Sequence, residues 1–521
     1  MFLTILTSLI IFLCILHCFI RYRREGRLLN QFPGPKEYPI IGNMHHFQVS
    51  NEELMKKYWQ LGEEFYPIFK MWSFFFSSII LLDPEDIKIF MKSKELTTKY
   101  IPYNYMQSWL ATGLLTSGGE KWQQRRKILT PTFHVDIIQH FLVTFNEEAQ
   151  FLVRSLREQA QEQDDGSIVQ DLLQLITKHS LNIICETILG ISLKEKGQLE
   201  SEYRNAVHGY GKIIPFRFAR PWYHLDRLFA LSPTGRLEKK LLKTLHSFSK
   251  NIIAERMRYH EQTNYKYLRN LNQINEENEK IAEKLEKNNK RTGLKKKLCL
   301  LDLLIVSYLD NKQIDYDGIR EEVDTFMFEG HDTTAMVLCF ALSLFAKHQN
   351  VQENIRSEVD MVMQREGCCQ LTTSMLRDCS YLERCVKESL RLYPSVHTIF
   401  RYLNEDLQLT KYVVPAGSNC QVSIYNVHRN PIYWPNPEVF DPDRFLPENI
   451  KVRHPYSFIP FSAGMRNCIG QKFAMFELKV LIAHILHNFR LEPVDEVDDV
   501  IISADITLTP SKPLHVRFIP I

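Results

Sequence analysis

The sequence lacks the features that mark several classes of protein. Its 521 residues show no internal repeat, and a formal net charge of +3 is too small to indicate a nucleic-acid-binding surface. The 11 cysteines are odd in number and scattered, without the paired CxxC units of a zinc module, so they favour reduced cytosolic thiols. With 45% hydrophobic and 24% charged residues, the composition is that of a globular protein with a large core, which excludes general disorder.

Charge is also absent from the N-terminus. Residues 2–20 contain no Asp, Glu, Lys or Arg, and a helix of that length just crosses the hydrocarbon core of a bilayer. A cleaved signal peptide is the alternative, but the segment has neither a basic start nor a small-residue cleavage site. We therefore expect residues 1–20 to be a transmembrane anchor. The basic-residue bias places the following chain in the cytosol, because four arginines come next: Arg21, Arg23, Arg24 and Arg27.

The rest of the chain is expected to be one catalytic domain behind a short hinge. The hinge spans residues 21–43, in which Pro33, Pro35 and Pro39 exclude helix and stiffen the connection. Residues 44–521 form the domain. Residues 263–297, rich in Asn, Glu and Lys, interrupt it as a charged surface excursion.

Hydrophobic spacing predicts a mainly α fold with small β-sheets. From about residue 50 to 260, apolar residues recur mainly at helical spacing, with short β-like runs such as residues 78–82. A long apolar helix is predicted over residues 319–347, and such a helix belongs in the core. The chain ends with Pro-rich connections and short β-like runs, which indicate a small sheet.

The segment FSAGMRNCIG carries the strongest chemical signal. It precedes an apolar-periodic helix, and a cysteine near a helix start experiences unpaired N–H groups and the helix dipole, which favour the metal-binding thiolate. Its glycines let the backbone approach a flat partner, its phenylalanine can pack beside the sulfur, and its arginine can pair with a carboxylate. A buried structural cysteine is the alternative. The pattern as a whole favours Cys468 as a metal ligand. Its five matching positions are Phe461, Gly464, Arg466, Cys468 and Gly470.

This pattern resembles the haem-binding loop of the cytochrome P-450 family. The resemblance implies haem b as the cofactor, with Cys468 as the axial ligand of its iron and a thiolate that favours O–O cleavage. It also implies the P-450 fold, mainly α with small β-sheets, carrying a single N-terminal transmembrane helix.

A second family pattern, EGHDTT, lies on the long predicted helix. Its polar residues interrupt an apolar surface, and burying such groups costs free energy unless they are paired or reactive. The hydroxyl of Thr333 can compete for a backbone carbonyl, and an acid followed by an alcohol suits proton delivery. The resemblance assigns Asp332 and Thr333 to the catalytic proton relay.

Glu329 departs from the family pattern, which has a small residue at this position. In this respect the chain resembles the fourth P-450 family, the branch rich in fatty-acid ω-hydroxylases, in which the matching glutamate forms an ester with a haem methyl group. A rigidly held porphyrin in a narrow cavity would present a terminal methyl to the oxidant. The alternative is that Glu329 is a hydrogen-bonded core carboxylate.

Two further motifs complete the resemblance. Glu388 and Arg391 lie three residues apart on one helix face, and with Arg444 of DPDRF they resemble the structural ExxR network of the family. A surface ion pair would explain an isolated ExxR. The propionates of haem need cations, and the family's WxxxR motif supplies part of the implied clamp: Trp122, Arg126, Arg401 and Arg466.

Two surface features each have two interpretations. Residues 213–231 are apolar and aromatic, which suits either ordinary core or a membrane-facing entrance for lipid-like substrates. Five basic residues form either a patch that steers an acidic electron donor or merely solvated surface: Arg125, Lys127, Lys451, Arg453 and Lys472.

The motifs occur in the family's order over essentially the whole chain. The resemblance implies a haem-thiolate monooxygenase of the endoplasmic reticulum membrane, with its catalytic domain in the cytosol. It would insert one oxygen atom from O2 into an aliphatic C–H bond, and the expected substrate is a fatty acid or other long-chain lipid attacked at or near its chain end. Electrons would come from NADPH through a flavoprotein reductase, with cytochrome b5 as an additional partner.

Three alternatives remain open. A terpenoid, hormone or xenobiotic hydroxylase of the same fold is the first, because specificity depends on scattered cavity residues. A reductase-independent peroxide isomerase or dehydratase is the second, although such an enzyme has no need of the Asp332 and Thr333 pair. A non-enzymatic haem sensor is the third, and it would show no substrate-dependent NADPH use.

Overall fold

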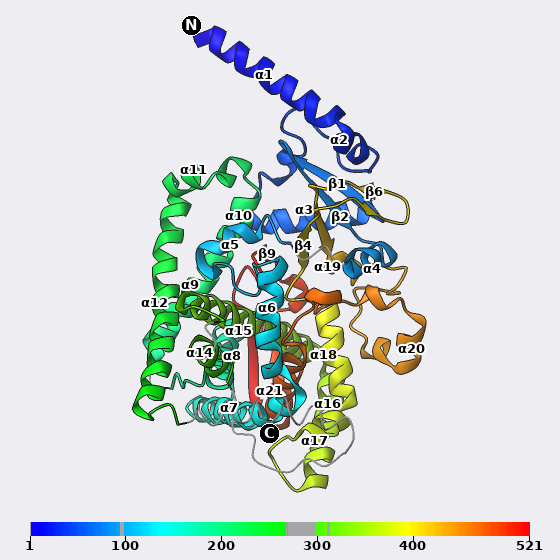
Figure 1. Cartoon of the computed structure of the whole chain (residues 1–521). Helices are drawn as coiled ribbons and strands as arrows, with labels where there is room; N and C mark the ends of the chain where they lie inside the picture. Colours follow the sequence, from blue (N-terminus) through cyan, green and yellow to red (C-terminus); the bar gives the residue numbers. More distant parts are fainter. Residues whose placement is uncertain (1, 94–97, 195, 267, 269–298, 310–312) are drawn as a thin grey trace, which may run out of the picture.

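The computed structural model describes residues 2–93, 98–194, 196–266, 268, 299–309 and 313–521. The charged surface excursion predicted at residues 263–297 falls almost wholly outside these ranges. Within them the chain forms a helical body with four small sheets, so the predicted class, mainly α with small β-sheets, is confirmed (Figure 1).

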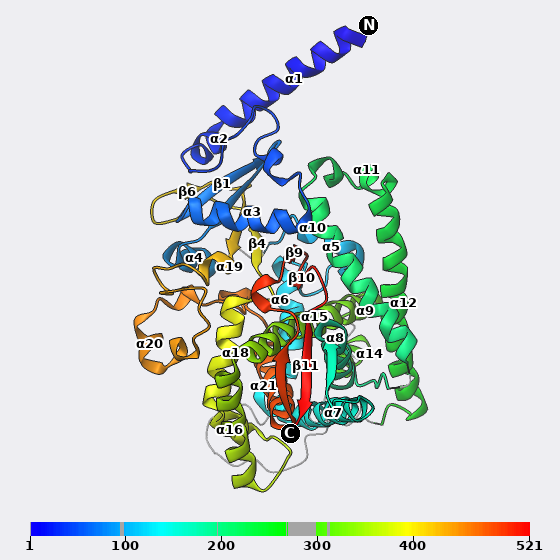
Figure 2. The ribbon, with the colours of Figure 1, turned by 180° about the vertical axis from the view of Figure 1, so that it is seen from behind.

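The N-terminal helix α1 (Phe2–Tyr22) projects from the body (Figures 1 and 2). Its mean hydropathy is 2.6, and it is the one described helix long and apolar enough to cross a membrane. The short helix α2 (Arg24–Leu29) follows within the predicted hinge. The junction is fixed to the body, because the Arg21 guanidinium lies 4.1 Å from the centroid of the Trp72 ring and pairs with Glu37.

The largest sheet joins segments that are far apart in the sequence. Its strand order is β1-β2-β7-β4, and only β2 and β7 are parallel. Side chains alternate across a strand, and one face of this sheet packs into an apolar core through residues such as Ile79 and Val422. The strands are β1 (Ile68–Ser73), β2 (Phe76–Leu81), β7 (Asn419–Ser423) and β4 (Thr398–Tyr402).

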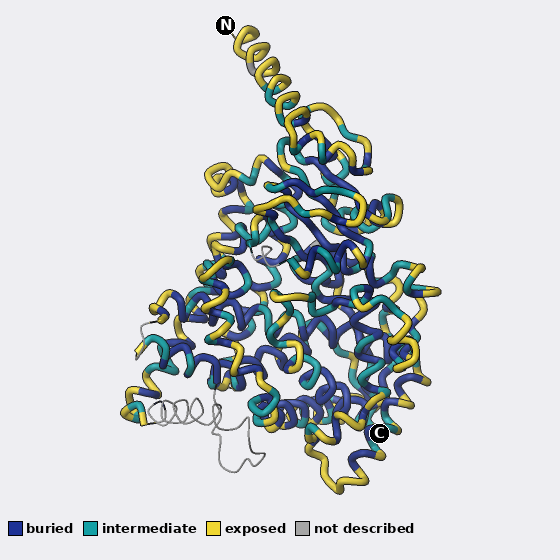
Figure 3. The backbone as a smooth tube through the Cα atoms, turned by 45° about the vertical axis from the view of Figure 1, so that its right-hand side comes forward, coloured by how far each residue is buried: buried dark blue, intermediate teal, exposed yellow. Residues whose placement is uncertain are grey.

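The core of the body is built around α15 (Tyr316–Lys347), which contains the long helix predicted at 319–347. It packs closely on α8 (Leu172–Ile184), because a Cβ at Gly330 would lie 2.3 Å from the Ile184 Cδ1 atom. Glycine therefore permits helix contact at this point. Beside this pair, α21 (Gln471–Asn488) packs on α7 (Val135–Gln161). Figure 3 shows buried residues concentrated in this central region, whereas α1 is exposed.

The remaining elements surround this centre. The other helices are α3 (Asn51–Glu64), α4 (Pro84–Lys92), α5 (Tyr103–Leu110), α6 (Gly119–Leu129), α9 (Gly197–Gly211), α10 (Ile213–Phe218), α11 (Asp226–Leu231), α12 (Pro233–Gln262), α14 (Leu300–Leu309), α16 (Gln349–Glu366), α17 (Thr373–Asp378), α18 (Ser380–Leu392), α19 (Ile424–Val427) and α20 (Pro447–Val452). The other strands are β3 (Ile168–Asp171), β5 (Leu407–Gln408), β6 (Val413–Val414), β8 (Phe489–Pro493), β9 (Ile502–Ala504), β10 (Leu508–Pro510) and β11 (His515–Pro520). They form the sheets β3-β11-β8, β5-β6 and β9-β10.

Candidate active site

Cys468 lies in a tight loop that ends where α21 begins. The backbone N–H of Cys468 donates a hydrogen bond to the Phe461 carbonyl at 2.9 Å, which closes the loop. Gly464 has a φ of +70°, and a Cβ there would lie 2.2 Å from the Met91 carbonyl oxygen, so the loop requires glycine. Gly470 caps α21, and a Cβ there would come no closer than 3.8 Å to another protein atom. The protein itself therefore leaves room above Gly470.

Cys468 is exposed even though many protein atoms lie around it, so the fold leaves open space beside this residue. Burial and the nearby Glu329 carboxylate raise the pKa of Cys468 to about 11, although the N–H of Gly470 opposes this shift. The helix start alone therefore does not favour the thiolate, in contrast to the expectation from the sequence. A bound metal ion would, because coordination deprotonates a thiol outright.

Helix α6 is joined to the cysteine loop through both predicted members of the WxxxR motif. Arg126 donates to the carbonyl and the side-chain oxygen of Asn467, both at 2.9 Å. The Arg466 guanidinium lies 4.8 Å from the centroid of the Trp122 ring. Arg466 also donates to the carbonyl of Ser117 at 2.8 Å, just before α6. The fold thus brings residues some 340 positions apart in the chain into one cluster.

Four cations gather beside Cys468: Lys99, Arg126, Arg401 and Arg466. Burial and mutual repulsion lower the pKa of Arg466 to about 9, and burial also lowers the pKa of Arg401. Burial and the two neighbouring arginines, Arg401 and Arg466, lower the pKa of Lys99 well below its usual range. Within the described ranges none of the four forms an ion pair closer than 4 Å, and the charge of Glu329 opposes the lowering of the pKa at three of them, Lys99, Arg126 and Arg466.

Lys99 was not foreseen from the sequence. It stands in the segment TTKYIPY, which matches no motif, and its role depends on the fold that brings this segment to α15. Its ammonium lies 3.9 Å from the centroid of the Tyr103 ring. The sequence gives no local signal for it, because Lys99 follows a polar stretch that already contains Lys92, Lys94 and Glu95.

Haem fits these residues. Cys468 is exposed, and the four cations beside it have no carboxylate partner within 4 Å among the described residues, so they can pair with two propionates. The Nη1 atom of Arg466 is buried without a hydrogen-bond acceptor among the described residues. A buried guanidinium donor without an acceptor is costly, so an anionic group at this place would stabilise the site.

The EGHDTT segment lies within helix α15, and its Glu329 is near the cation cluster. The Thr333 hydroxyl donates to the Glu329 carbonyl at 2.6 Å, as its position four residues later allows. Burial raises the pKa of Glu329, while the charge of Lys99 opposes the shift. His331 is buried, and its Nδ1 atom lies 2.5 Å from the Met327 carbonyl oxygen. Its ring therefore contacts the backbone of its own helix.

Asp332 is held by a residue that the sequence did not indicate. The Thr507 hydroxyl, from the turn between β9 and β10, donates to the Asp332 Oδ2 atom at 2.7 Å. Thr507 lines the adjacent cavity, whereas Asp332 lies behind it. The two residues are 175 positions apart, and only the tertiary structure could have paired them.

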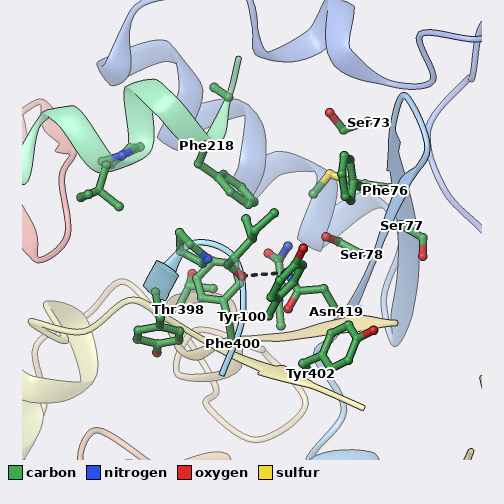
Figure 4. Close-up of a pocket in the computed structure, with 18 of the residues that line it drawn as sticks. Ser73, Phe76, Ser77, Ser78, Tyr100, Phe218, Thr398, Phe400, Tyr402 and Asn419 are labelled. Atoms are coloured by element: carbon green, nitrogen blue, oxygen red, sulfur yellow. Dashed lines mark hydrogen bonds between the residues drawn. The ribbon is translucent and has the colours of Figure 1, made fainter. Parts of the chain in front are cut away.

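A cavity of about 300 Å³ extends from this segment of α15 toward the N-terminal helices. Glu329, Thr333 and Phe328 line its inner end, and residues from α1 and α2 line the other. Its middle section is largely aromatic and apolar, with Phe218, Tyr100 and Phe400 pointing inward (Figure 4). The shape and lining suit an elongated hydrophobic molecule.

The ExxR residues form a fully buried network. The Arg391 guanidinium binds both carboxylate oxygens of Glu388 at 2.8 Å, and Arg444 approaches the same carboxylate at 3.4 Å. Arg391 also donates to the carbonyls of His428, Pro437 and Val439. The His428 ring in turn accepts a hydrogen bond from the N–H of Ile459, at 2.9 Å, two residues before Phe461. The network therefore supports the cysteine loop from behind.

The basic patch is only partly present. Arg125 is buried against Glu321 and Glu322 of α15, so it does not belong to the surface. Arg453 packs over the Trp434 ring at 3.9 Å and is half-buried. Three members of the patch are exposed: Lys127, Lys451 and Lys472.

Comparisons with known proteins all indicate the same family. The cytochrome P-450 family model matches residues 32–518. The chain is 37% identical to cytochrome P-450 4c3 of Drosophila melanogaster, over 99% of this chain and 94% of that protein. It is 35% identical to cytochrome P-450 4V2 of Rattus norvegicus, over 97% and 93% respectively. It is 36% identical to cytochrome P-450 4c21 of Blattella germanica, over 98% and 97%.

Proposed function

Because the chain belongs to the cytochrome P-450 family and is therefore a haem-thiolate monooxygenase, we propose that it hydroxylates a fatty acid or other long-chain lipid at or near the chain end. The observation that carries this proposal is the cavity. It is long and mainly apolar, and it ends at Glu329 and Thr333 of α15. A flexible chain entering from the α1 and α2 side would reach α15 with its terminal carbons first.

Haem supplies the activation of O2 when bound, with electrons from a redox partner. We assign its axial ligand to Cys468. The edge and the propionates of the haem would be held by residues of α6, β4 and the cysteine loop: Trp122, Arg126, Arg401, Phe461, Arg466 and Gly470. Lys99 joins this clamp because it shares the charge environment of Arg401 and Arg466.

Glu329 is the residue that would attach the cofactor covalently. Its carboxylate lines the cavity, and its charge affects both Cys468 and Arg126, so it lies within the haem-binding cluster. We propose that it forms an ester with a haem methyl group: a methyl C–H bond is broken and a C–O bond to Glu329 forms. The two electrons released would reduce O2 to water together with two electrons from the redox partner. The link would stiffen the inner end of the cavity and leave room for a chain terminus rather than for a bent chain.

Asp332 and Thr333 would manage the protons of the reaction. The Thr333 hydroxyl lines the cavity and is oriented by the Glu329 carbonyl, so its oxygen can accept a bond from water on the cavity side. Asp332 is oriented by Thr507, which separates it from the cavity. A carboxylate held in this way can pass a proton through the Thr507 or Thr333 hydroxyl without moving its backbone.

We further propose that the protein sits on the endoplasmic reticulum membrane with its catalytic domain in the cytosol. Helix α1 would span the bilayer, and Figures 1 and 2 place α11 at the same end of the molecule. Exposed apolar side chains on and beside α11 would enter the same bilayer: Trp222, Leu225, Leu228 and Leu231. Lipid could then reach the cavity without crossing water. The reductase would dock from the cytosolic side.

Reconstitution tests the proposed reaction. The full-length haem protein would be combined with an NADPH-dependent flavoprotein reductase in phospholipid vesicles, with and without cytochrome b5, and given fatty acids of increasing length. We expect product hydroxylated at the terminal or adjacent carbon, formed only with reductase and NADPH. Product formed only from terpenoids, or equal turnover of added hydroperoxide without reductase, would contradict the proposal.

A further inference from the structure

The largest sheet turns an unusual face toward the cavity. In most two-faced sheets the polar face meets water, but here β2, β7 and β4 place several polar residues, together with Phe400 and Tyr402, on the face that lines the cavity. The opposite face contributes Ile79 and Val422 to a core cluster, and it also carries Arg401 of the cation cluster. The strand register places four polar side chains on the cavity face: Ser78, Thr398, Asn419 and Gln421. Figure 4 shows the first three of them. We call these four residues the polar wall.

Two atoms of the polar wall have no hydrogen-bond partner among the described residues. Gln421 is fully buried, and its Oε1 atom accepts from the Tyr58 hydroxyl at 2.9 Å, but its Nε2 donor is unpaired. Asn419 is 8% exposed, and its amide donates to the Ile101 carbonyl, but its Oδ1 acceptor is unpaired. Each unpaired buried group costs about 1–3 kcal/mol, so a wall with both is expected to have a ligand.

The two unpaired atoms are complementary in kind and belong to neighbouring side chains on one face of β7. Asn419 and Gln421 are two residues apart on one strand, so their side chains point to the same side, about 7 Å apart at the Cα atoms. One offers an acceptor and the other a donor. A hydroxyl group can satisfy both at once, since it donates one hydrogen bond and accepts others.

The charge around the polar wall argues against an ionised ligand. Among the described residues that line the cavity, the only lysine or arginine is Arg23, at the α2 end, and it already pairs with Glu25 at 3.2 Å. A carboxylate pressed against the polar wall would lose its hydration without gaining a cation, which is costly. A neutral polar group loses much less hydration free energy when it is buried there.

We propose that the polar wall binds the uncharged hydroxyl end of a lipid substrate, whose hydrocarbon chain then runs toward Glu329 and Thr333. This rests on the proposed lipid-oxidising function and narrows its substrate class from fatty acids to long-chain alcohols and related neutral lipids. Fixing one end at Gln421 and Asn419 would make chain length the property that selects the carbon presented at α15.

Binding titrations on the haem-loaded full-length protein test this, with the shift of the haem absorption spectrum as the signal. The ligands are 1-dodecanol, dodecanoic acid and dodecane at pH 7.4, which share one chain and differ only at the end. We expect dodecanol to bind more tightly than either of the others. A net hydrogen bond of about 1 kcal/mol corresponds to roughly fivefold in Kd, so two give roughly 25-fold over dodecane.

Variants then locate the effect. Gln421→Met and Asn419→Leu keep the side-chain volume but remove the donor or acceptor, and each should weaken dodecanol binding about fivefold while leaving dodecane unchanged. Gln408→Leu is the matched control, because Gln408 is an exposed amide on β5 outside the cavity. The reduced carbon monoxide spectrum of each variant reports correct assembly, and the wild-type ligand comparison stands even if a variant fails to assemble.

Two outcomes would overturn the proposal. The first is tighter binding of dodecanoic acid than of dodecanol, lost in Arg23→Gln, which would place a carboxylate at the α2 end instead. The second is an unchanged dodecanol Kd in both wall variants, which would mean that water, and not the ligand, binds the unpaired atoms of Gln421 and Asn419. Failure of the broader lipid-oxidising function would look different: dodecanol would still bind through the wall, but no lipid would be hydroxylated in the reconstituted system.

Discussion

The contact between Thr507 and Asp332 gives the sharpest test of how this protein handles protons. Replacing Thr507 with valine keeps the shape of the side chain but removes the hydroxyl that donates to Asp332 Oδ2 at 2.7 Å. A hydrogen bond to a charged group contributes about 1.5–3 kcal/mol. If Asp332 must keep this orientation for proton delivery, the full loss would slow that step by roughly 10- to 150-fold.

The assay is the partition of electrons in the reconstituted system. We expect Thr507→Val to consume NADPH at a near-normal rate but to divert most of the electrons to hydrogen peroxide, so that hydroxylated product per NADPH falls about tenfold or more. Thr507→Ser restores the hydroxyl and should restore coupling. A purely structural role for Thr507 would instead lower haem content or substrate binding, with the product-to-NADPH ratio unchanged.

A matched control is available on the adjoining strand. Thr509 of β10 is equally buried and lies 3.4 Å from the Thr507 hydroxyl, but it makes no direct contact with Asp332. Thr509→Val should therefore couple normally. Wild-type coupling in Thr507→Val, or an equal loss in Thr509→Val, would refute the positioning role assigned to Thr507.

Four further predictions follow from the site and its supports. Cys468→Ser should abolish the characteristic absorption band of the reduced carbon monoxide complex, and a retained band would refute the ligand assignment. Denaturing extraction should leave some haem on the wild type and none on Glu329→Ala; complete release from the wild type would exclude the ester. Arg391→Met should remove the bidentate partner of the buried Glu388 and leave only the more distant Arg444 beside its charge, at a cost of about 3–5 kcal/mol, measured as a lower Tm and haem content. Burial raises the pKa of Glu477 to about 8, so the folded protein holds a proton that the unfolded chain releases above about pH 4.5. The free energy of unfolding should fall as pH rises from 4.5 to 8, by up to about 4–5 kcal/mol from this group, and Glu477→Gln should remove that slope in denaturant titrations.

Sequence patterns were most informative where chemistry depends on neighbours along the chain. The cysteine loop, the EGHDTT turn of helix and the Glu388 and Arg391 pair each fall within ten residues, so local geometry relates their members directly. The hydroxyl of Thr333 bonds the carbonyl four residues earlier, as helical spacing implies. The long core helix was located for the same reason, since its apolar residues follow one continuous period.

Sequence patterns failed where the environment of a side chain is set by a segment far away in the chain. Arg125 was grouped with surface lysines because it lies in a basic run, yet the fold buries it against two glutamates of α15. The thiolate expected from the helix start is offset by burial, a property that no local motif contains. Lys99 carries no motif at all, and it matters only because its segment crosses α15 beside Glu329.

The residues alone determined the type of chemistry, since a cysteine in a glycine-bent loop, an acid with an alcohol, and a charged helix pair are recognisable wherever the chain folds. The tertiary structure decided which groups surround them. It joined Thr507 to Asp332 across 175 positions, and it turned four polar side chains of one sheet toward the cavity. The physical reason is that hydrogen bonds and desolvation act over a few ångströms in space, whatever separation along the chain the residues have.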